Sequence, residues 1–438
     1  MESDDGQMDR IKKYKRMLWI WFWCSVAALF AGAYYLCYSR IPANIKIRAG
    51  MDQTLDFGVP VTGKFTRIQE YPELLAVSEN TDAALPSQTV SMELHESVTL
   101  RAMKKEHYRL SLKLWGVLPL KQIEVQVIED ELLTPAGIPI GIYVKTKGVL
   151  VIGVGDFKTL QGTNSAPARY LLKTGDYILS VNGTEIEGKA DFMERIGSCE
   201  GSELVLTVQR EDQVFDVKLK PQQNENGEYK LGIWIRDNAQ GVGTLTFLDE
   251  EDRFGALGHG INDVDTNELL HLKSGTLYHT DIINIRKGVS GTPGEMTGMI
   301  DYTGQNILGE ICENCVQGIY GEGNERLREQ LEKEALPIAL KQEIHKGQAQ
   351  ILCTVEDRPE YFEVEITDVN LGHDNVNRGI VLKVTDDRLL EKTGGIIQGM
   401  SGAPILQDGR LIGAVTHVLV QDSAKGYGIF IENMLSES

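Results

Sequence analysis

The sequence predicts a mainly β protein of several domains behind an N-terminal transmembrane anchor. The chain has 438 residues, long enough for two or three domains, and 42% of them are hydrophobic while 24% are charged, as in globular proteins. After the first 40 residues, short β-branched and alternating runs separated by glycine and proline predict strands. Only residues 324–336, "NERLREQLEKEAL", show a clear helical period of charged residues and leucines.

The anchor is predicted over residues 17–38. This stretch contains no charged residue and slightly exceeds the roughly 20 apolar residues that span a bilayer. Tryptophans near one end, tyrosines near the other and a basic segment before it favour a cytoplasmic N-terminus over residues 1–16. A cleaved signal peptide is the alternative, because Ala31-Gly32-Ala33 resembles a cleavage site, but the apolar run is longer than signal peptides use.

Charge and cysteine usage exclude several classes of function. The 44 Lys and Arg residues against 63 Asp and Glu give a net charge of -19, the wrong sign for a protein that binds nucleic acid. Cys312 and Cys315 form a lone C-x-x-C without a second ligand pair at a zinc spacing and without a surrounding βαβ pattern. We therefore expect no metal and no cofactor, and a redox or metal role for this pair is the weakest hypothesis.

Two β-rich regions follow the anchor. Residues 45–127 predict a small β domain, and residues 129–221 change pattern to "ARYLLKTGDYILSVNG", a short helix, a Gly-Asp turn, an apolar strand and an Asn-Gly hairpin turn. The second region resembles a PDZ domain. The resemblance implies a peptide groove at Gly141, Ile142 and Tyr143, where a peptide would add as an extra strand. A PDZ-like spacer without a ligand is the alternative.

The remaining residues, 222–438, are again strand-rich and predict an all-β barrel domain. A serine hydroxyl is a weak nucleophile unless a base takes its proton, and His259, between glycines at the end of a predicted strand, is the strongest candidate base. His417 lies inside an apolar strand, where a packed histidine is expected. Ser401 and Ser290 both stand in Gly-x-Ser-Gly-x-Pro, but the segment after Ser290 suggests a turn, whereas an apolar run follows Ser401.

The order of anchor, PDZ-like region, "FGALGHGIND" and "VTDDRLLEKTGGIIQGMSGAPILQDGRLIGAVTHV" resembles the stage IV sporulation protein B peptidases of endospore-forming bacteria. The resemblance implies a Ser-His-Asp endopeptidase on a chymotrypsin-like double β-barrel, with Ser401, His259 and Asp386 as the triad. It also implies an oxyanion hole made by the backbone N–H groups of Gly399 and Ser401. Asp387 is adjacent to Asp386, and the alternative role for Asp386 is the N-cap of a helix over "DRLLEKTG".

The resemblance further implies a role in sporulation signalling. The protein would be anchored in the forespore membrane, with its soluble domains between the forespore and mother-cell membranes. There it would cleave a membrane-bound regulatory protein, triggering mother-cell sigma-factor processing, and would cleave its own N-terminal region. The alternative is a non-enzymatic PDZ scaffold with a protease-like barrel, and an active-site serine probe separates the two.

Overall fold

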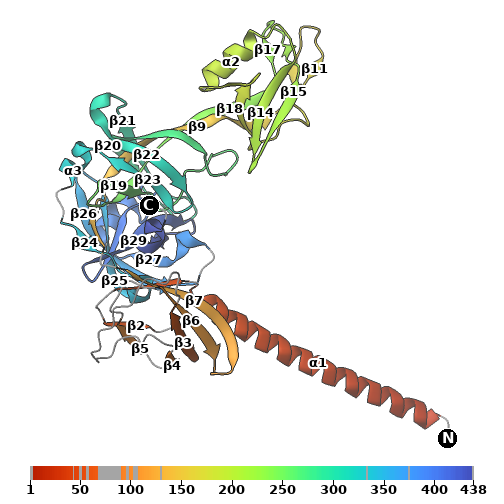
Figure 1. Ribbon diagram of the computed structural model, residues 1–438, viewed down its shortest axis with the longest axis vertical. Helices are drawn as coiled ribbons and strands as arrows, with labels where there is room; N and C mark the ends of the chain where they lie inside the picture. The colour runs from red at the N-terminus through yellow and green to blue at the C-terminus, as the bar shows by residue number, and fades with distance from the viewer. Residues whose placement is uncertain are drawn as a thin grey trace, which may run out of the picture. The chain divides into compact units, whose positions relative to one another are not determined.

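The computed structural model is mainly β with one long N-terminal helix (Figure 1). It describes residues 3–42, 44–48, 52–55, 59–67, 90–94, 98–101, 107–128, 131–331, 334–372 and 375–436. The chain divides into two compact units. One comprises residues 1–130 with the short segments 340–345 and 370–375, and the other comprises the rest of the chain.

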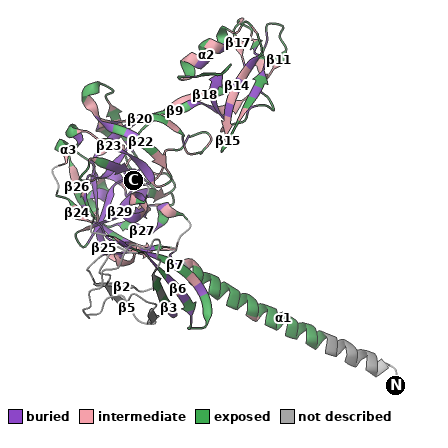
Figure 2. Ribbon diagram, in the orientation of Figure 1, coloured by how far each residue is buried: buried purple, intermediate pink, exposed green. Residues whose placement is uncertain are grey.

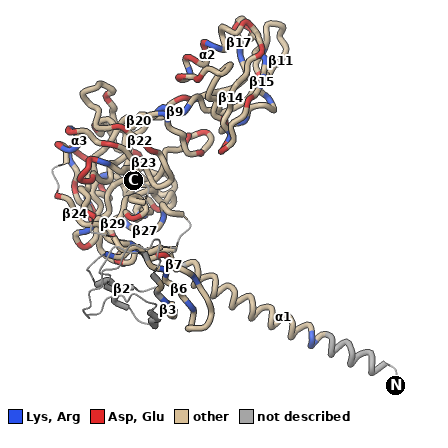
Figure 3. Tube along the Cα trace, viewed as in Figure 1, with Lys and Arg blue, Asp and Glu red and all other residues tan. Residues whose placement is uncertain are grey.

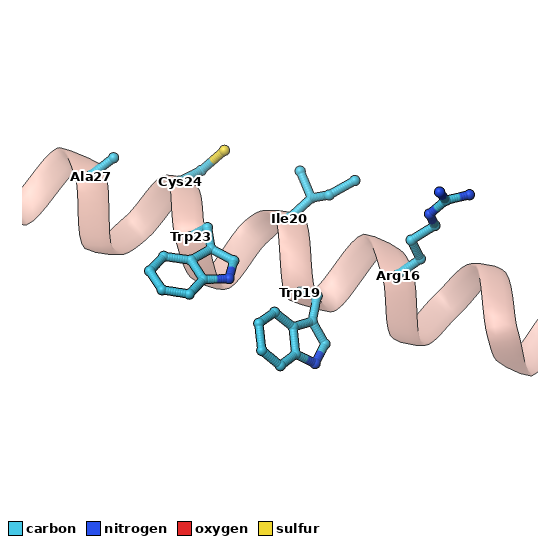
Figure 4. Close-up of a pocket in the computed structure, with 6 residues that line it drawn as sticks. All are labelled: Arg16, Trp19, Ile20, Trp23, Cys24 and Ala27. Atoms are coloured by element: carbon cyan, nitrogen blue, oxygen red, sulfur yellow. The ribbon is translucent and has the colours of Figure 1, made fainter.

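Helix α1, Ser3–Arg40, carries the predicted anchor. Its segment Tyr14–Ser39 has a mean hydropathy of 1.6 and is long and apolar enough to cross a membrane. The side chains of this segment are mostly exposed (Figure 2), and the segment is uncharged beyond Arg16 (Figure 3). Figure 4 shows Trp19 and Trp23 on one side of the helix, with ring centroids 6.1 Å apart. Such aromatic rings are typical of the interface between lipid and water.

A five-stranded sheet follows the helix in the same unit. Its core contains Ile45, Ile47, Leu110 and Ile123, which point to one face because side chains alternate along a strand. The strands lie in the order β1 (Asn44–Arg48), β7 (Leu118–Ile128), β6 (His107–Leu114), β3 (Val61–Arg67) and β4 (Val90–Leu94), and a separate pair joins β2 (Asp52–Leu55) to β5 (Val98–Arg101).

The second unit contains two closed rings of antiparallel strands. In the first ring each strand pairs with the next, and the last pairs with the first. Its members are β9 (Pro139–Val154), β20 (Leu272–Arg286), β22 (Ile307–Cys315), β23 (Gly318–Gly323), β19 (Arg253–Ala256) and β18 (Ile233–Leu248). Strands β8 (Leu132–Pro135), β21 (Glu295–Ile300) and β24 (Leu336–Pro337) flank it, and α3 (Glu325–Gln330) follows β23.

The second ring is a closed six-stranded barrel. Its order is β25 (Gly347–Thr354), β26 (Pro359–Val369), β27 (Ile380–Val384), β30 (Asp422–Phe430), β29 (Arg410–Leu419) and β28 (Pro404–Gln407), with α4 (Asp387–Thr393) after β27 and α5 (Ile431–Leu435) after β30. Figure 2 shows buried residues concentrated in the strands of the rings. The pairings thus agree with the double β-barrel that the sequence resemblance implies.

Two strands of the first ring continue into a smaller lobe. The end of β9 and the start of β18 pair with each other there, and β9 also pairs with β12. The lobe has its own core, from Val149 to Leu231, around Phe192 and Leu206. Its elements are β10 (Phe157–Lys158), β11 (Asn164–Ser165), β12 (Tyr177–Val181), β13 (Thr184–Glu185), α2 (Lys189–Gly197), β14 (Leu204–Arg210), β15 (Gln213–Leu219), β16 (Gln222–Gln223) and β17 (Tyr229–Lys230).

This topology differs from the expected order of a PDZ domain over 129–221 followed by a peptidase domain over 222–438. Residues 139–146 already belong to the first ring, and the lobe is inserted between two neighbouring strands of that ring. The predicted groove at Gly141, Ile142 and Tyr143 is therefore wrong. These residues pair with β18 on one side and with β20 on the other, so no free strand edge remains there for a peptide.

Candidate active site

Ser401 lies on a tight turn that only glycines permit. Gly399 and Gly402 have φ angles of +101° and +98°, in the left-handed region. A Cβ on Gly402 would lie 2.0 Å from the carbonyl oxygen of Thr244. The turn is fixed by hydrogen bonds from the Gly402 N–H to the Val415 carbonyl (2.7 Å) and from the Thr244 N–H to the Ser401 carbonyl (3.0 Å). The Gly-rich motif that surrounds Ser401 thus fixes the backbone that carries the Ser401 side chain.

His259 lies on a second strained turn, directly after β19. Leu257 and Gly258 both have positive φ angles, +69° and +68°, which reverse the chain before the imidazole. The His259 Nδ1 lies 2.9 Å from the Gly260 carbonyl. Because a carbonyl oxygen only accepts, Nδ1 carries the proton and Nε2 is left as the acceptor. Burial lowers the pKa of His259, and the bond to Gly260 opposes this effect only in part, so the ring is a neutral base at pH 7.

The two residues line one cleft of about 630 Å³ that also includes residues of both rings. The Ser401 hydroxyl donates to the Thr416 carbonyl at 2.8 Å, and within the described residues no hydrogen bond joins it to His259. The Ser401 hydroxyl would have to turn away from the Thr416 carbonyl before it could donate to the imidazole. Ser401 and His259 thus line the same cleft, and the Ser401 hydroxyl is hydrogen-bonded to the backbone carbonyl of Thr416.

A buried asparagine connects the two turns. The Asn377 side chain donates to the carbonyls of Gly258 (2.6 Å) and Val316 (2.8 Å), and the backbone carbonyl of Asn377 accepts a hydrogen bond from the Thr416 hydroxyl at 2.7 Å. Gly258 precedes His259, and Thr416 holds the hydroxyl of Ser401. Asn377 lies in a short 3-10 turn, residues 376–378, without a recognisable motif, so the sequence carried no signal for it.

Among the described residues, no hydrogen bond joins Asp386 to the imidazole of His259. It is the N-cap of α4, and its carboxylate accepts hydrogen bonds from the backbone N–H groups of Arg388 (2.9 Å), Leu389 and Glu363 (both 3.3 Å). Its Oδ2 also lies 3.0 Å from the Arg388 guanidinium. Burial opposes ionisation of Asp386, but these hydrogen bonds outweigh it and lower its pKa. The capping alternative is what the structure shows, and the partner on Nδ1 of His259 is a backbone carbonyl.

The oxyanion hole is expected at the backbone N–H groups of Gly399 and Ser401. Within the described residues, neither the Gly399 N–H nor the Ser401 N–H has a hydrogen-bond partner, although both residues line the cleft. Each peptide unit is fixed through its carbonyl. Met296 N–H donates to the Gln398 carbonyl (2.8 Å), and Ala403 N–H donates to the Met400 carbonyl (2.9 Å). Because N–H and C=O point in opposite directions in a trans peptide, these bonds also fix the directions of the two free N–H groups.

The other residues that the sequence offers for a catalytic or metal-binding role are Ser290, His417 and the pair Cys312 and Cys315. Ser290 is exposed in a turn, and its hydroxyl donates to the Gln421 carbonyl at 2.9 Å. His417 is exposed rather than packed, and its ring lies 5.2 Å from the ring of His259. Cys312 and Cys315 lie on β22, and the part of the chain that the structure describes contains no group of three metal-binding side chains.

Comparisons with known proteins find a peptidase family over the C-terminal half of the chain. Residues 227–435 match the family model described as SpoIVB peptidase S55. A search of curated proteins returns no match. Among solved structures, the inactive form of the Rv3671c protease is 12% identical and covers 45% of this chain and 83% of its own, with a TM-score of 0.23. The active form of Rv3671c from M. tuberculosis is 13% identical, covers 45% of this chain and 74% of its own, and has a TM-score of 0.24.

Proposed function

We propose that Ser401 is the nucleophile and His259 the general base of a membrane-anchored serine endopeptidase, because residues 227–435 match the family model described as SpoIVB peptidase S55. One observation carries this assignment. A serine on a glycine-built turn and a histidine line the same cleft, and among the described residues the histidine Nε2 and two nearby backbone N–H groups have no hydrogen-bond partner. Nucleophile, base and oxyanion donors are the parts that acyl transfer requires.

The proposed reaction begins with the hydroxyl of Ser401. An N–H group of a bound peptide competes for the Thr416 carbonyl, which frees the hydroxyl to turn to Nε2 of His259. His259 takes the hydroxyl proton as Ser401 Oγ attacks the scissile carbonyl. The carbonyl oxygen becomes an oxyanion and accepts hydrogen bonds from the N–H groups of Gly399 and Ser401. His259 then protonates the leaving amine, and water repeats the sequence on the acyl-enzyme. The Gly260 carbonyl fixes the tautomer throughout.

The cleft favours an uncharged substrate segment. None of the residues that line it is Asp, Glu, Lys or Arg, although 24% of the chain is charged. The branched aliphatic residues that line it are Ile142, Val242, Leu257, Ile261, Val264, Ile396, Ile397, Val418 and Val420. A charged side chain would lose hydration here without gaining a partner, which disfavours its binding. We propose that the residues around the scissile bond are uncharged.

We further propose that the lobe acts as a PDZ domain that docks a membrane-bound regulatory protein. Segment 233–236 of β18 pairs only with β9 among the described strands, and α2 stands next to it, tied by the Lys189 N–H to the Asp237 carboxylate at 2.8 Å. A peptide can add at this edge instead of at residues 141–143.

We also propose that the protein is anchored in the forespore membrane, that its cleavage of the regulatory protein triggers sigma-factor processing, and that it cleaves its own chain near the N-terminus. The apolar helix α1 and the match to a sporulation peptidase family support this proposal.

The test uses the full chain in detergent micelles with a fluorophosphonate probe and peptide mapping of the adduct. We expect the adduct on Ser401, no labelling of Ser401→Ala, and strongly reduced labelling of His259→Ala, since loss of a catalytic residue costs on the order of 10⁴ to 10⁶ in kcat. Ser290→Ala is the matched control and should label like the wild type. No adduct on a folded wild type would favour the non-enzymatic scaffold, and an adduct on Ser290 would move the nucleophile.

A further inference from the structure

The segment that follows His259, residues 260–271, is here called the base loop. It folds around Asp263, whose side chain is fully buried. The Oδ1 of Asp263 accepts hydrogen bonds from the backbone N–H groups of Asp265 (2.9 Å) and Thr266 (3.0 Å). The backbone carbonyl of Asp263 accepts a hydrogen bond from the Asn267 N–H at 2.8 Å. A buried carboxylate needs a compensating cation, because backbone hydrogen bonds alone do not neutralise its charge.

Arg236 supplies that cation from the lobe. It lies on β18 where the strand pairs with Leu150, beside the lobe core. One nitrogen of its guanidinium, Nη1, pairs with Asp263 Oδ2, and the other, Nη2, lies 2.7 Å from Asp265 Oδ2. A planar guanidinium presents a separate nitrogen to each carboxylate in this way, whereas a lysine ammonium has only one nitrogen for both. The fold of the base loop therefore depends on a side chain from the strand that enters the lobe.

Other lobe residues contact the end of the same loop. The N–H of His271 donates to the Tyr177 hydroxyl at 3.2 Å, and the two rings stack with centroids 4.9 Å apart. The Gln209 side chain lies 3.4 Å from His271 Nδ1. Tyr177 and Gln209 are on β12 and β14 of the lobe. Together with Arg236 on β18, three lobe strands thus hold the base loop.

The base loop also forms the active-site cleft. Its first residue, Gly260, provides the carbonyl that fixes Nδ1 of His259. Further along, Ile261, Asn262 and Val264 line the cleft, and the side chain of Val264 is 86% exposed. A displacement of the loop therefore changes both the direction of the imidazole and one wall of the substrate site.

We propose that Arg236 is a positioning residue that holds the base loop through Asp263 and Asp265 and so couples the lobe to the catalytic base. The proposal rests on the assignment of His259 as the base. It makes the orientation of His259 sensitive to any movement of β18 in the lobe, which is also the strand proposed to receive a peptide. The coupling is carried by an ion pair and by continuous strands, which are physical links between the two sites.

The test compares Arg236→Ala with Arg253→Ala. Arg253 is a matched control, because it also bridges two carboxylates of one turn, Asp249 (2.7 Å) and Glu251 (3.2 Å), but does not line the cleft. We expect Arg236→Ala to lower the second-order rate constant of fluorophosphonate labelling at Ser401 about tenfold or more. Arg253→Ala should stay within twofold of the wild type. Arg236→Lys should recover part of the rate, since an ammonium can pair with one of the carboxylates.

Hydrogen exchange of the full chain gives a readout that does not require activity. Amides of residues 265–267 should exchange at least tenfold faster in Arg236→Ala, and the exchange of β25 and β26 in the second ring should be unchanged. Exchange and labelling both within twofold of the wild type would overturn the proposal, as would an equal loss in Arg253→Ala. Absence of labelling in the wild type would refute the assigned peptidase activity instead, and the exchange result would still decide whether Arg236 holds the loop.

Discussion

Replacing Gly399 by alanine should damage catalysis much more than stability. At its φ of +101° an alanine is strained, at a cost of about 1–2 kcal/mol. The new Cβ would also lie 2.8 Å from the Cβ of Met296, well inside normal contact. A Cβ cannot rotate away, and the Met296 N–H is hydrogen-bonded to the Gln398 carbonyl, so the peptide that carries the Gly399 N–H must move.

That movement removes one proposed oxyanion donor from its position. Loss of such a donor costs about 10²–10³ in kcat, equivalent to about 2.7–4 kcal/mol of transition-state stabilisation. The assay is hydrolysis of an uncharged peptide, with stability measured by denaturant unfolding of the same preparation. We expect kcat to fall by that factor, while the change in KM is small because the donor acts mainly in the transition state.

Gly409→Ala separates strain from catalysis. Gly409 has a φ of +73°, but its Cβ position has no atom within 4 Å. The substitution should therefore cost about the same 1–2 kcal/mol of strain and leave kcat unchanged. A folded Gly399→Ala variant with kcat within threefold of the wild type would refute the oxyanion assignment.

Three further outcomes follow from the site. Asp386→Asn should keep labelling at Ser401 within tenfold of the wild type, because asparagine caps a helix as well as aspartate does; a thousandfold loss in a folded variant would restore Asp386 as the third catalytic residue. Because burial lowers the pKa of His259, the base stays neutral to lower pH, and the acid limb of labelling against pH should have its midpoint below the ordinary 6.5. A midpoint above that value would contradict the burial argument. Peptides with Asp or Lys beside the scissile bond should be hydrolysed at least tenfold more slowly than uncharged ones, and equal kcat/KM values would count against the charge-free cleft.

The features that could be predicted from the sequence are those that short segments determine. An uncharged run of residues 17–38 is visible without a fold, and the structure places it in α1. The glycines around Ser401 indicate a turn because few other residues adopt positive φ, and the structure has such angles at Gly399 and Gly402. The same reasoning selected His259, which follows a turn of two residues with positive φ.

The prediction of a peptide groove at residues 141–143 failed because the sequence pattern of a strand does not show which other strands pair with it. The alternation in "GIPIGIYVKTKGVLVIGV" predicted a strand, and β9 is one. Which edges of a strand stay free depends on pairing with residues far away in the chain, here those of β18 and β20. A 16-residue strand shared by a ring and a lobe is not visible in its own sequence.

Asp386 illustrates the same limit in the active site. Its motif fits a triad member and a helix N-cap equally, and only tertiary structure shows that its carboxylate is used by Arg388, Leu389 and Glu363. With a carbonyl rather than a carboxylate on Nδ1, the imidazolium of His259 gains no ion pair as it forms. The site must then rely more on the placement of the ring. In this molecule that placement depends on the base loop and on Arg236, so the lobe inserted into the first ring is also a structural support of the base.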